Sequence, residues 1–174
     1  MRSNLPEVLI LEHDNVIDSR GGFQKVQSGN ISSVFQDLKF MESGFATNRS
    51  KGTIRGLHFK KAPSNEWKMV TCVNGAIFDV TVDVRLDSKN YGKVYVHELN
   101  LMKGISLIIP PGFAHGYQTL TDEANVFYQF TEIYKSLTTM RLKYDDANLG
   151  ITWPIAVTQI SIDDKEAPPW PVKY

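Results

Sequence analysis

The most regular alternation of apolar and polar residues runs from Ala76 to Arg85. Every second position is apolar and the positions between are polar: Phe78, Val80, Val82 and Val84 against Asp79, Thr81, Asp83 and Arg85. A period of two places successive side chains on opposite faces, so this pattern predicts a β-strand. The acidic face would normally meet water. If that face lines a cavity, its carboxylates need partners, and Lys68 on the preceding strand is a candidate partner for Asp79.

Shorter apolar stretches, each bounded by Gly, Pro, Asn or Asp, predict further strands. We expect them at Pro6–Leu11, from Phe23, within Gly52–Phe59, from Trp67 to Val70, and at Lys93–Leu99, Ser106–Ile109, Gly116–Thr119 and Asn125–Thr131. The best helix candidate is Ser32–Leu38, and the segment from Asp145 to Pro171 is expected to wrap the domain with turns or short helices. Many short strands with little helix between them are typical of an all-β sandwich or small barrel.

Composition limits the domain count and the class of partner. A chain of 174 residues with 42% apolar residues suits one domain, residues 1–174, with a full core. Nineteen basic residues balance nineteen acidic ones, so no global field favours nucleic acid or an anionic membrane, and any anion site must be local. The single cysteine, Cys72, and the lack of a signal-like or membrane-length apolar run lead us to expect a cytoplasmic protein.

The residues with the clearest candidate chemistry lie in Gly52–Phe59, where Arg55 and His58 are three residues apart. The two glycines of this stretch would let a ligand approach the backbone. An isolated histidine in a strand is by default packed or hydrogen-bonded, so this motif alone favours a structural role for His58. The prolines of Pro110–Gly116 donate no backbone hydrogen bond, which predicts that this stretch, with His115, lies at a strand end or rim where ligands can enter.

Seven separated blocks together carry a more specific signal. They are Arg55–Phe59, Lys68–Val70, Phe78–Asp83, Pro111–Gly116, Tyr128, Leu149–Pro154 and Ser161–Pro168. In order and spacing they resemble the dTDP-4-dehydrorhamnose 3,5-epimerase family over nearly the whole chain. The resemblance implies a cupin-type double-stranded β-helix, or jelly roll, with short peripheral helices. It also implies a homodimer that exchanges N-terminal strands, and an active site inside the barrel that uses no metal and no cofactor.

Epimerisation next to a ketone needs a base on one face, a cation or donor at the developing enolate oxygen, and a proton donor on the other face. The resemblance assigns His58 as the base, with Asp164 as the acceptor that holds its other nitrogen. It assigns Lys68 to the enolate oxygen, with Asp79 as the carboxylate that fixes the lysine. Tyr128 would be the acid on the opposite face.

The resemblance further implies a set of residues that bind a nucleotide-diphosphate sugar. They are Arg20, Phe23, Lys25, Asn48, Arg55, His115 and Tyr134. Arg20 and Arg55 would neutralise the diphosphate, because an arginine fork matches phosphate oxygens well.

Four departures from the family pattern lie near these positions. Lys25 stands where the family commonly has Glu, Ala46-Thr47-Asn48 replaces Gln-Asp-Asn, Gln129 replaces a lysine, and Asp163 takes a position that is often basic. The nucleobase (dTDP, CDP or GDP), the sugar, and the choice of C3, C5 or both therefore stay open at this stage.

Three other functions compete with an epimerase of deoxysugar biosynthesis. A metal-dependent cupin needs clustered ligands, whereas the histidines here, His13, His58, His97 and His115, are isolated in sequence. A sugar 3,4-ketoisomerase on the same scaffold could also use a histidine base. A noncatalytic sugar-binding jelly roll would need none of these titratable groups aligned. The combination of His58, Lys68, Tyr128 and Asp164 favours epimerisation.

Overall fold

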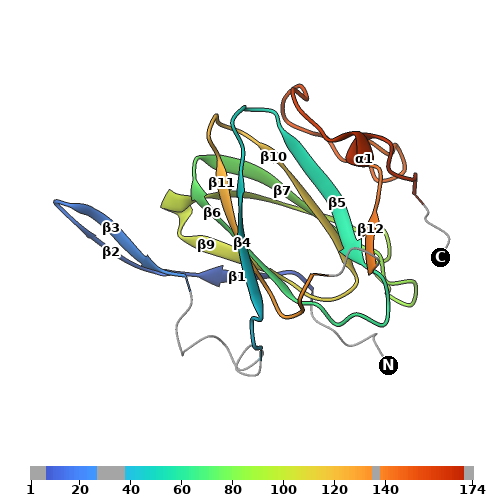
Figure 1. Cartoon of the computed structure of the whole chain (residues 1–174), viewed down its shortest axis with the longest axis horizontal. Helices are drawn as coiled ribbons and strands as arrows, with labels where there is room; N and C mark the ends of the chain where they lie inside the picture. Colours follow the sequence, from blue (N-terminus) through green and yellow to red (C-terminus); the bar gives the residue numbers. More distant parts are fainter. Residues whose placement is uncertain (1–6, 27–37, 135–137, 171–174) are drawn as a thin grey trace.

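The computed structural model describes residues 7–26, 38–134 and 138–170, and two antiparallel sheets of five strands dominate it (Figure 1). The first sheet has the order β1 (Leu9–Glu12), β9 (Ile105–Ile109), β6 (Lys68–Asn74), β11 (Asn125–Phe130) and β4 (Glu42–Thr47). The second has the order β12 (Thr139–Arg141), β5 (Ile54–Lys60), β10 (Phe113–Thr119), β7 (Ala76–Asp83) and β8 (Val94–Asn100). The prediction of an all-β jelly roll is therefore confirmed.

Three smaller elements complete the described part of the chain. A separate hairpin consists of β2 (Asp14–Asp18) and β3 (Gly21–Lys25), the 3-10 turn η1 spans Leu101–Lys103, and the short helix α1 spans Ile162–Lys165. The predicted helix Ser32–Leu38 falls, except for its last residue, outside the described residues. Pro110 and Pro111 lie between the end of β9 and the start of β10, as their missing donors predicted.

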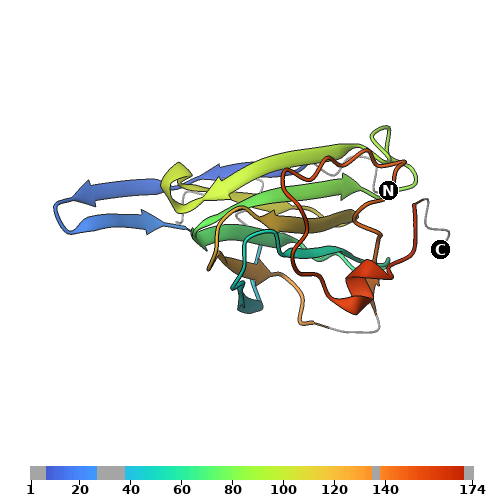
Figure 2. The same ribbon diagram turned by 90° about the horizontal axis from the view of Figure 1, so that it is seen from above.

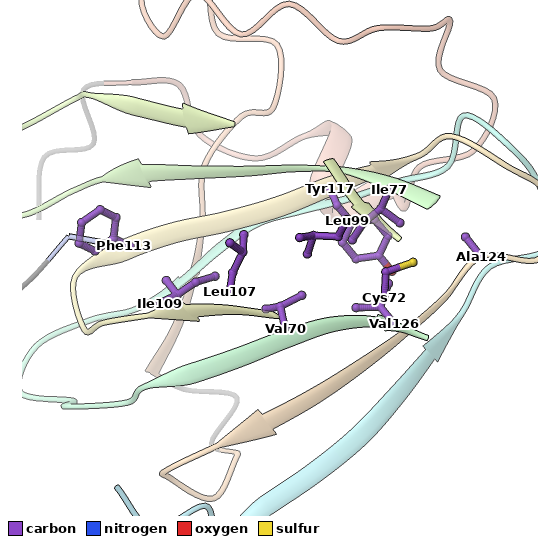
Figure 3. Close-up of a cluster of buried hydrophobic side chains, with 10 residues drawn as sticks. All are labelled: Val70, Cys72, Ile77, Leu99, Leu107, Ile109, Phe113, Tyr117, Ala124 and Val126. Carbon is purple, nitrogen blue, oxygen red and sulfur yellow. The ribbon is translucent and has the colours of Figure 1, made fainter. Parts of the chain in front are cut away.

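The main core lies between the two sheets, and strands of both supply its side chains (Figure 3). Its buried members are Val70, Cys72, Ile77, Leu99, Leu107, Ile109, Phe113, Tyr117, Ala124 and Val126. Each well-buried aliphatic or aromatic side chain contributes about 1.5–3 kcal/mol of hydrophobic stabilisation, so this cluster is what holds the sheets together.

The strand β7 is buried on both faces, which explains its alternation. Its apolar residues Val80 and Val82 face outward and pack under the C-terminal part of the chain, in a second cluster with Leu142 and Leu149. Its acidic residues Asp79 and Asp83 are fully buried toward the interior, the reverse of the usual arrangement.

Both buried carboxylates of β7 have cationic or hydrogen-bonding partners, as predicted for an acidic face turned inward. The Nε2 atom of His115 lies 2.7 Å from Asp79, and Arg85 Nη2 donates to Asp83 over 2.6 Å.

Residues 142–170 form a strap along the outer face of the second sheet, drawn orange to red in Figure 2. Backbone bonds tie it down: Leu142 N–H donates to the Leu57 carbonyl over 2.9 Å, and Ile54 N–H donates to the Gln159 carbonyl over 2.8 Å. The strap ends in α1, whose N-cap Ser161 accepts a hydrogen bond from the Asp164 N–H. The course of the strap thus places Asp164 beside β5, the strand that contains His58.

The β2–β3 hairpin projects beyond the sandwich (Figures 1 and 2). At its base, Gln24 Nε2 donates to the Leu101 carbonyl over 2.6 Å. Its apolar side chains are open to solvent, with Phe23 63% and Val16 61% exposed. An arm of this kind exposes apolar surface that a second chain could cover.

Candidate active site

A cavity of about 610 Å³ opens between the two sheets and the end of the strap. Its wall includes all four predicted catalytic residues, His58, Lys68, Tyr128 and Asp164, and three of the predicted binding residues, Arg55, His115 and Tyr134. These side chains come from β5, β6, β10 and β11, from the strap, and from the loop after β11. The fold therefore brings together residues that are more than a hundred positions apart in sequence.

A bulge in β5 directs Arg55 and His58 into the same cavity. Residues three apart in a regular strand point to opposite faces. Here Arg55 pairs with Tyr117 and His58 pairs with His115, so β5 uses one residue more than β10 between these two pairs. The extra residue turns both side chains to one side, which is a common use of bulges beside active sites.

Gly56 makes this bulge possible. Its φ is +118°, and a Cβ atom there would lie 2.6 Å from the Cα of Gly116 on β10. The sequence predicted that glycines in this motif admit a ligand, but at Gly56 the close approach is to the neighbouring strand. The Gly56 N–H has a second use, because it donates to Asp164 Oδ2 over 3.1 Å.

His58 and Asp164 form the predicted pair, with His58 Nε2 2.6 Å from Asp164 Oδ1. Asp164 is buried, whereas about a third of the His58 side chain is exposed. Burial would raise the pKa of the Asp164 carboxyl, but the bonds from His58 and Gly56 outweigh burial and lower that pKa. Within the described residues no hydrogen bond joins His58 Nδ1, so an ionised carboxylate holds one ring nitrogen while the other is available at the cavity.

Arg141 is a cavity residue that the sequence analysis missed. It pairs with His58 in the β5–β12 ladder, its Nη2 lies 3.0 Å from Asp163 Oδ2, and its Nε lies 3.4 Å from Asp164 Oδ1. Asp163, which departs from the family pattern, thus has a cation beside it. The β12 strand has only three residues, too few for a periodic signal.

Lys68 lines the cavity without an ion pair within 4 Å among the described residues. Its Nζ lies 5.8 Å from the centre of the Phe130 ring. Burial lowers the pKa of Lys68, whereas the negative charges of Glu66 and then Asp79 raise it. The predicted direct contact of Lys68 with Asp79 is not formed, because Asp79 bonds to His115 instead.

Glu66 is therefore a second residue that the sequence analysis missed. Its side chain lines the cavity, is only 8% exposed, and lies 3.9 Å from the Lys60 ammonium. It stands two positions before Lys68, so both can point to one side of the chain as it enters β6. A glutamate in a polar loop carries no sequence signal of this kind.

Asp79 and His115 form a buried pair in which His115 lines the cavity and Asp79 lies behind it. Their side chains are 0% and 3% exposed. Burial lowers the pKa of His115, and the neighbouring Asp79 only partly offsets this. The His115 ring lies edge-on to Tyr128 with 6.2 Å between ring centres. The pair thus packs against the Tyr128 ring through His115.

Tyr128 stands on the first sheet, facing the second sheet that carries His58. Its ring stacks on Phe130 with 5.7 Å between centres. Burial, reinforced by the nearby Tyr117 and Asp79, raises the pKa of Tyr128 well above its usual value. The phenol is therefore protonated over the physiological pH range and suits an acid.

Arg55 supplies a cation to the same cavity, and Asn48 holds it there. Arg55 Nε donates to Asn48 Oδ1 over 2.8 Å, and Nη2 donates to the Thr47 carbonyl over 3.1 Å. Asn48 itself is buried and does not line the cavity. The structure thus places this predicted substrate-binding residue behind Arg55.

Arg20, Phe23 and Lys25 do not line the cavity of their own chain. All three belong to the projecting β2–β3 hairpin or its turn, and the Arg20 side chain is 88% exposed. Arg20 is paired with Asp18 at 2.6 Å. The sequence predicted all three as substrate-binding residues, but the hairpin carries them away from this site.

Two features are absent from residues 7–26, 38–134 and 138–170. Within them, no three His, Cys, Asp or Glu side chains gather as ligands for a metal ion. No helix in the same segments has the length and apolar character needed to cross a membrane.

Comparison with known proteins agrees with this geometry. The family model described as dTDP-4-dehydrorhamnose 3,5-epimerase matches residues 2–171. A dTDP-4-dehydrorhamnose 3,5-epimerase from Sinorhizobium fredii is 34% identical over 167 residues, which cover 95% of this chain and 86% of that protein.

Solved structures give the same result. A dTDP-4-dehydrorhamnose 3,5-epimerase from Bacillus anthracis, with TDP and PPi bound, has a TM-score of 0.88 and 30% identity, covering 97% of both chains. A 3'-monoepimerase from Streptomyces bikiniensis in complex with dTDP-quinovose has a TM-score of 0.86 and 26% identity, covering 95% of this chain and 85% of that one. The chain therefore belongs to the dTDP-4-dehydrorhamnose 3,5-epimerase family and is a carbohydrate isomerase of the epimerase type.

Proposed function

We propose that this protein inverts C3, C5 or both in a 4-keto-6-deoxy sugar linked to a nucleoside diphosphate, as a step of deoxysugar biosynthesis. One observation carries the proposal: a histidine held by a buried carboxylate and a protonated tyrosine line one cavity from facing sheets. A base and an acid on opposite sides of a planar intermediate are what inversion at carbon requires.

Proton abstraction is the first step. The free Nδ1 of His58 takes the proton from the carbon beside the ketone, and the electron pair of the broken C–H bond moves toward the ketone oxygen to form an enolate. Asp164 stabilises the imidazolium that results, as a carboxylate does for the histidine of a catalytic triad. The Lys68 ammonium would donate to the enolate oxygen, and losing one such donor typically costs ~10²–10³ in rate.

Reprotonation completes the inversion. The enolate electron pair forms a new C–H bond with the Tyr128 proton on the other face, and the ketone is restored. Tyr128 regains a proton from water and His58 releases one to water, so the enzyme returns to its starting charge.

The substrate class follows from the cations of the site. Arg55, held by Asn48, would bind the diphosphate in a fork geometry. Two similar structures were solved with TDP and PPi and with dTDP-quinovose, so a thymidine diphosphate sugar is the first candidate. We further propose that residues 1–174 act as one domain. The metal independence, the absence of a cofactor and the cytoplasmic location expected from the sequence stay predictions.

We also propose a homodimer in which the β2–β3 hairpins are exchanged. The exposed Phe23 and Val16 support this, since an arm with apolar side chains is stable when a second chain covers it. Arg20 and Lys25 would then reach the partner's cavity, where their charge suits a diphosphate.

The test is proton exchange in deuterated water. The purified protein is incubated with dTDP-, CDP- and GDP-linked 4-keto-6-deoxy sugars, and NMR follows deuterium at C3 and C5. We expect exchange with inversion for one nucleotide, and loss of both in His58→Asn with the fold intact. A noncatalytic binding protein would show no exchange, and a 3,4-ketoisomerase would move the carbonyl from C4 to C3. Near-normal turnover in His58→Asn would contradict the mechanism.

A further inference from the structure

Arg141 presents a cation to the cavity from the edge strand β12. It lies directly opposite His58 in the β5–β12 ladder, it lines the cavity wall, and its side chain is 39% exposed. Side chains that face each other across an antiparallel ladder lie close together, so Arg141 stands beside the proposed base. The proposed proton transfers give this cation no part, and its contacts have to explain its presence.

The contacts of Arg141 are an exposed ion pair and a near approach to Asp164. Its Nη2 lies 3.0 Å from Asp163 Oδ2, and the Asp163 side chain is 68% exposed. Its Nε lies 3.4 Å from Asp164 Oδ1, but no described residue forms a hydrogen bond with this nitrogen. Asp164 Oδ1 is already bonded to His58. A guanidinium has five N–H donors, of which Asp163 can occupy only some.

The ion pair between Arg141 and Asp163 is of the weak kind. Water screens the attraction between exposed side chains, and ordering two such side chains has an entropy cost, so pairs of this type contribute little. A phosphate group is a better partner, because its oxygens match two parallel N–H groups of a guanidinium and it can carry more charge than a carboxylate. A phosphate in the cavity would therefore compete with Asp163 for Arg141.

The charges of the cavity leave few cations for such an anion. Among the described residues, four cations and four carboxylates line the wall: Arg55, Lys60, Lys68 and Arg141, with Glu42, Glu66, Glu132 and Asp164. Lys60 lies 3.9 Å from Glu66, and Lys68 is assigned to the enolate oxygen in the proposed reaction. The printed bonds of Arg55 go to uncharged acceptors, Asn48 Oδ1 and the Thr47 carbonyl. The two arginines are thus the cations best placed to bind an anionic ligand.

We propose that Arg141 is a further substrate-binding residue, which binds the diphosphate of the substrate together with Arg55, and that Asp163 is the counter-ion displaced when the diphosphate binds. The inference rests on the proposed function and adds residues to its diphosphate site. Arg141 strengthens the binding of the anion. Asp163 weakens it, because the diphosphate must replace an existing attraction. The two members of one ion pair therefore act in opposite directions on the same affinity.

The experiment measures the dissociation constant, Kd, of a nucleoside diphosphate by isothermal titration calorimetry. The probes are dTDP, CDP and GDP, and the one that binds the wild type most tightly is used for the variants. Arg141→Met removes the charge and keeps much of the bulk, so Kd should rise about tenfold, as for the loss of a hydrogen bond to a charged group. Asp163→Asn keeps the size and removes the competing charge, so Kd should fall about twofold to fivefold.

The double variant tests whether Asp163 acts through Arg141. Without the arginine, Asp163→Asn should change Kd by less than about twofold, because residues that act through one contact are not additive. Asp145→Asn is the matched control. Asp145 also lies on the strap in an exposed ion pair, 3.7 Å from Lys143, but does not line the cavity. Its loss should leave Kd within about twofold of the wild type.

Turnover gives a second measurement on the same variants. In the NMR assay of epimerisation, Arg141→Met should raise KM more than it lowers kcat, because the cation binds a part of the substrate that does not react. If Arg141→Met does not fold, Arg141→Lys keeps the charge but loses the fork, and its Kd should rise about threefold.

The inference fails on any of three results. An unchanged Kd in folded Arg141→Met, or in Arg141→Lys where only that variant folds, would mean that Arg141 does not bind the diphosphate. A raised Kd in Asp163→Asn would mean that the pair supports the site only as a structural unit. An equal fall in Kd with and without Arg141 would reduce Asp163 to a general charge effect. Proton exchange by the wild type would leave the proposed function standing in each case. If the wild type binds no nucleoside diphosphate, the diphosphate site is wrong, and if it also shows no exchange, the proposed function fails with it.

Discussion

At the scale of single residues, the charge of Lys68 depends on neighbours that are not its hydrogen-bond partners. Burial lowers its pKa, and the carboxylate that opposes this most is Glu66, ahead of Asp79. Lys60 acts in the opposite sense. Glu66, which takes no part in the proposed proton transfers, is therefore the residue that most opposes the effect of burial on Lys68.

Glu66→Gln tests this dependence. The change removes a negative charge and keeps the size, so the pKa of Lys68, already lowered, falls further. Because the proposed reaction needs the ammonium, the alkaline decline of kcat should move to lower pH. The measurement is a pH profile of kcat for wild type and variant.

The control for this prediction is Glu42→Gln. Glu42 also lines the cavity, but it accepts from the Tyr134 N–H over 2.6 Å and is not among the charges that act on Lys68. In Glu42→Gln, the alkaline decline of kcat should stay at the same pH as in the wild type. If the alkaline decline of kcat in Glu66→Gln stayed at the wild-type pH, Glu66 would be excluded as the residue that keeps Lys68 charged.

Sequence reasoning predicted four residues that the fold brings to one cavity, His58, Lys68, Tyr128 and Asp164, but missed two that surround them. His58 and Tyr128 are unremarkable singly, and only the ordered blocks of the family pattern identified them. Glu66 and Arg141 were missed because their roles come from contacts across the fold, which a linear pattern does not contain.

At the scale of elements, periodicity predicted strands wherever the buried face was apolar. It predicted β7 correctly but not which face is inside, because the strap provides a second apolar layer. It missed β4, where Gly44 and Ala46 turn inward and Phe45 is 67% exposed. Small inward residues and an outward aromatic remove the alternation that marks a strand.

The bulge of β5 leads to a prediction about Gly56→Ala. The new methyl group would lie 2.6 Å from the Gly116 Cα and 2.7 Å from the His115 carbonyl oxygen, and both are backbone atoms that side-chain rotation cannot move. We expect a loss of roughly 1–3 kcal/mol in the free energy of unfolding, as for an overpacked core. Because β5 must shift, activity should fall about a hundredfold or more in protein that is still folded.

The control here is Gly44→Ala on β4, where an added Cβ would meet no atom within 4 Å. Urea unfolding and the NMR exchange assay, run on both variants, give stability and activity separately. If Gly56→Ala and Gly44→Ala behaved alike, the bulge would not be what aligns Arg55 with His58.

At the scale of the whole molecule, the cavity holds the proposed base, acid and enolate cation but lacks the residues of the hairpin. Arg55 and Lys68 come from the sandwich and Asp164 from the strap, whereas Arg20, Phe23 and Lys25 lie on an arm that leaves the body of its own chain. An exchanged dimer would reconcile the residues expected from the family with the position of the arm. Complementation between two inactive variants can test this.

Arg20→Ala and His58→Asn chains are each purified, then unfolded and refolded together in equal amounts. If Arg20 serves the partner's cavity, a mixed dimer has one site with its own His58 and the partner's intact arginine, and one site with neither. Half of the dimers are mixed and each has one intact site, so about a quarter of wild-type activity should return. If Arg20 instead folds back into the cavity of its own chain, every site in the mixed dimer lacks one residue and no activity returns. Size-exclusion chromatography with light scattering, run on the same samples, must show a dimer for the first outcome, and a monomer with full wild-type activity would contradict the exchange altogether.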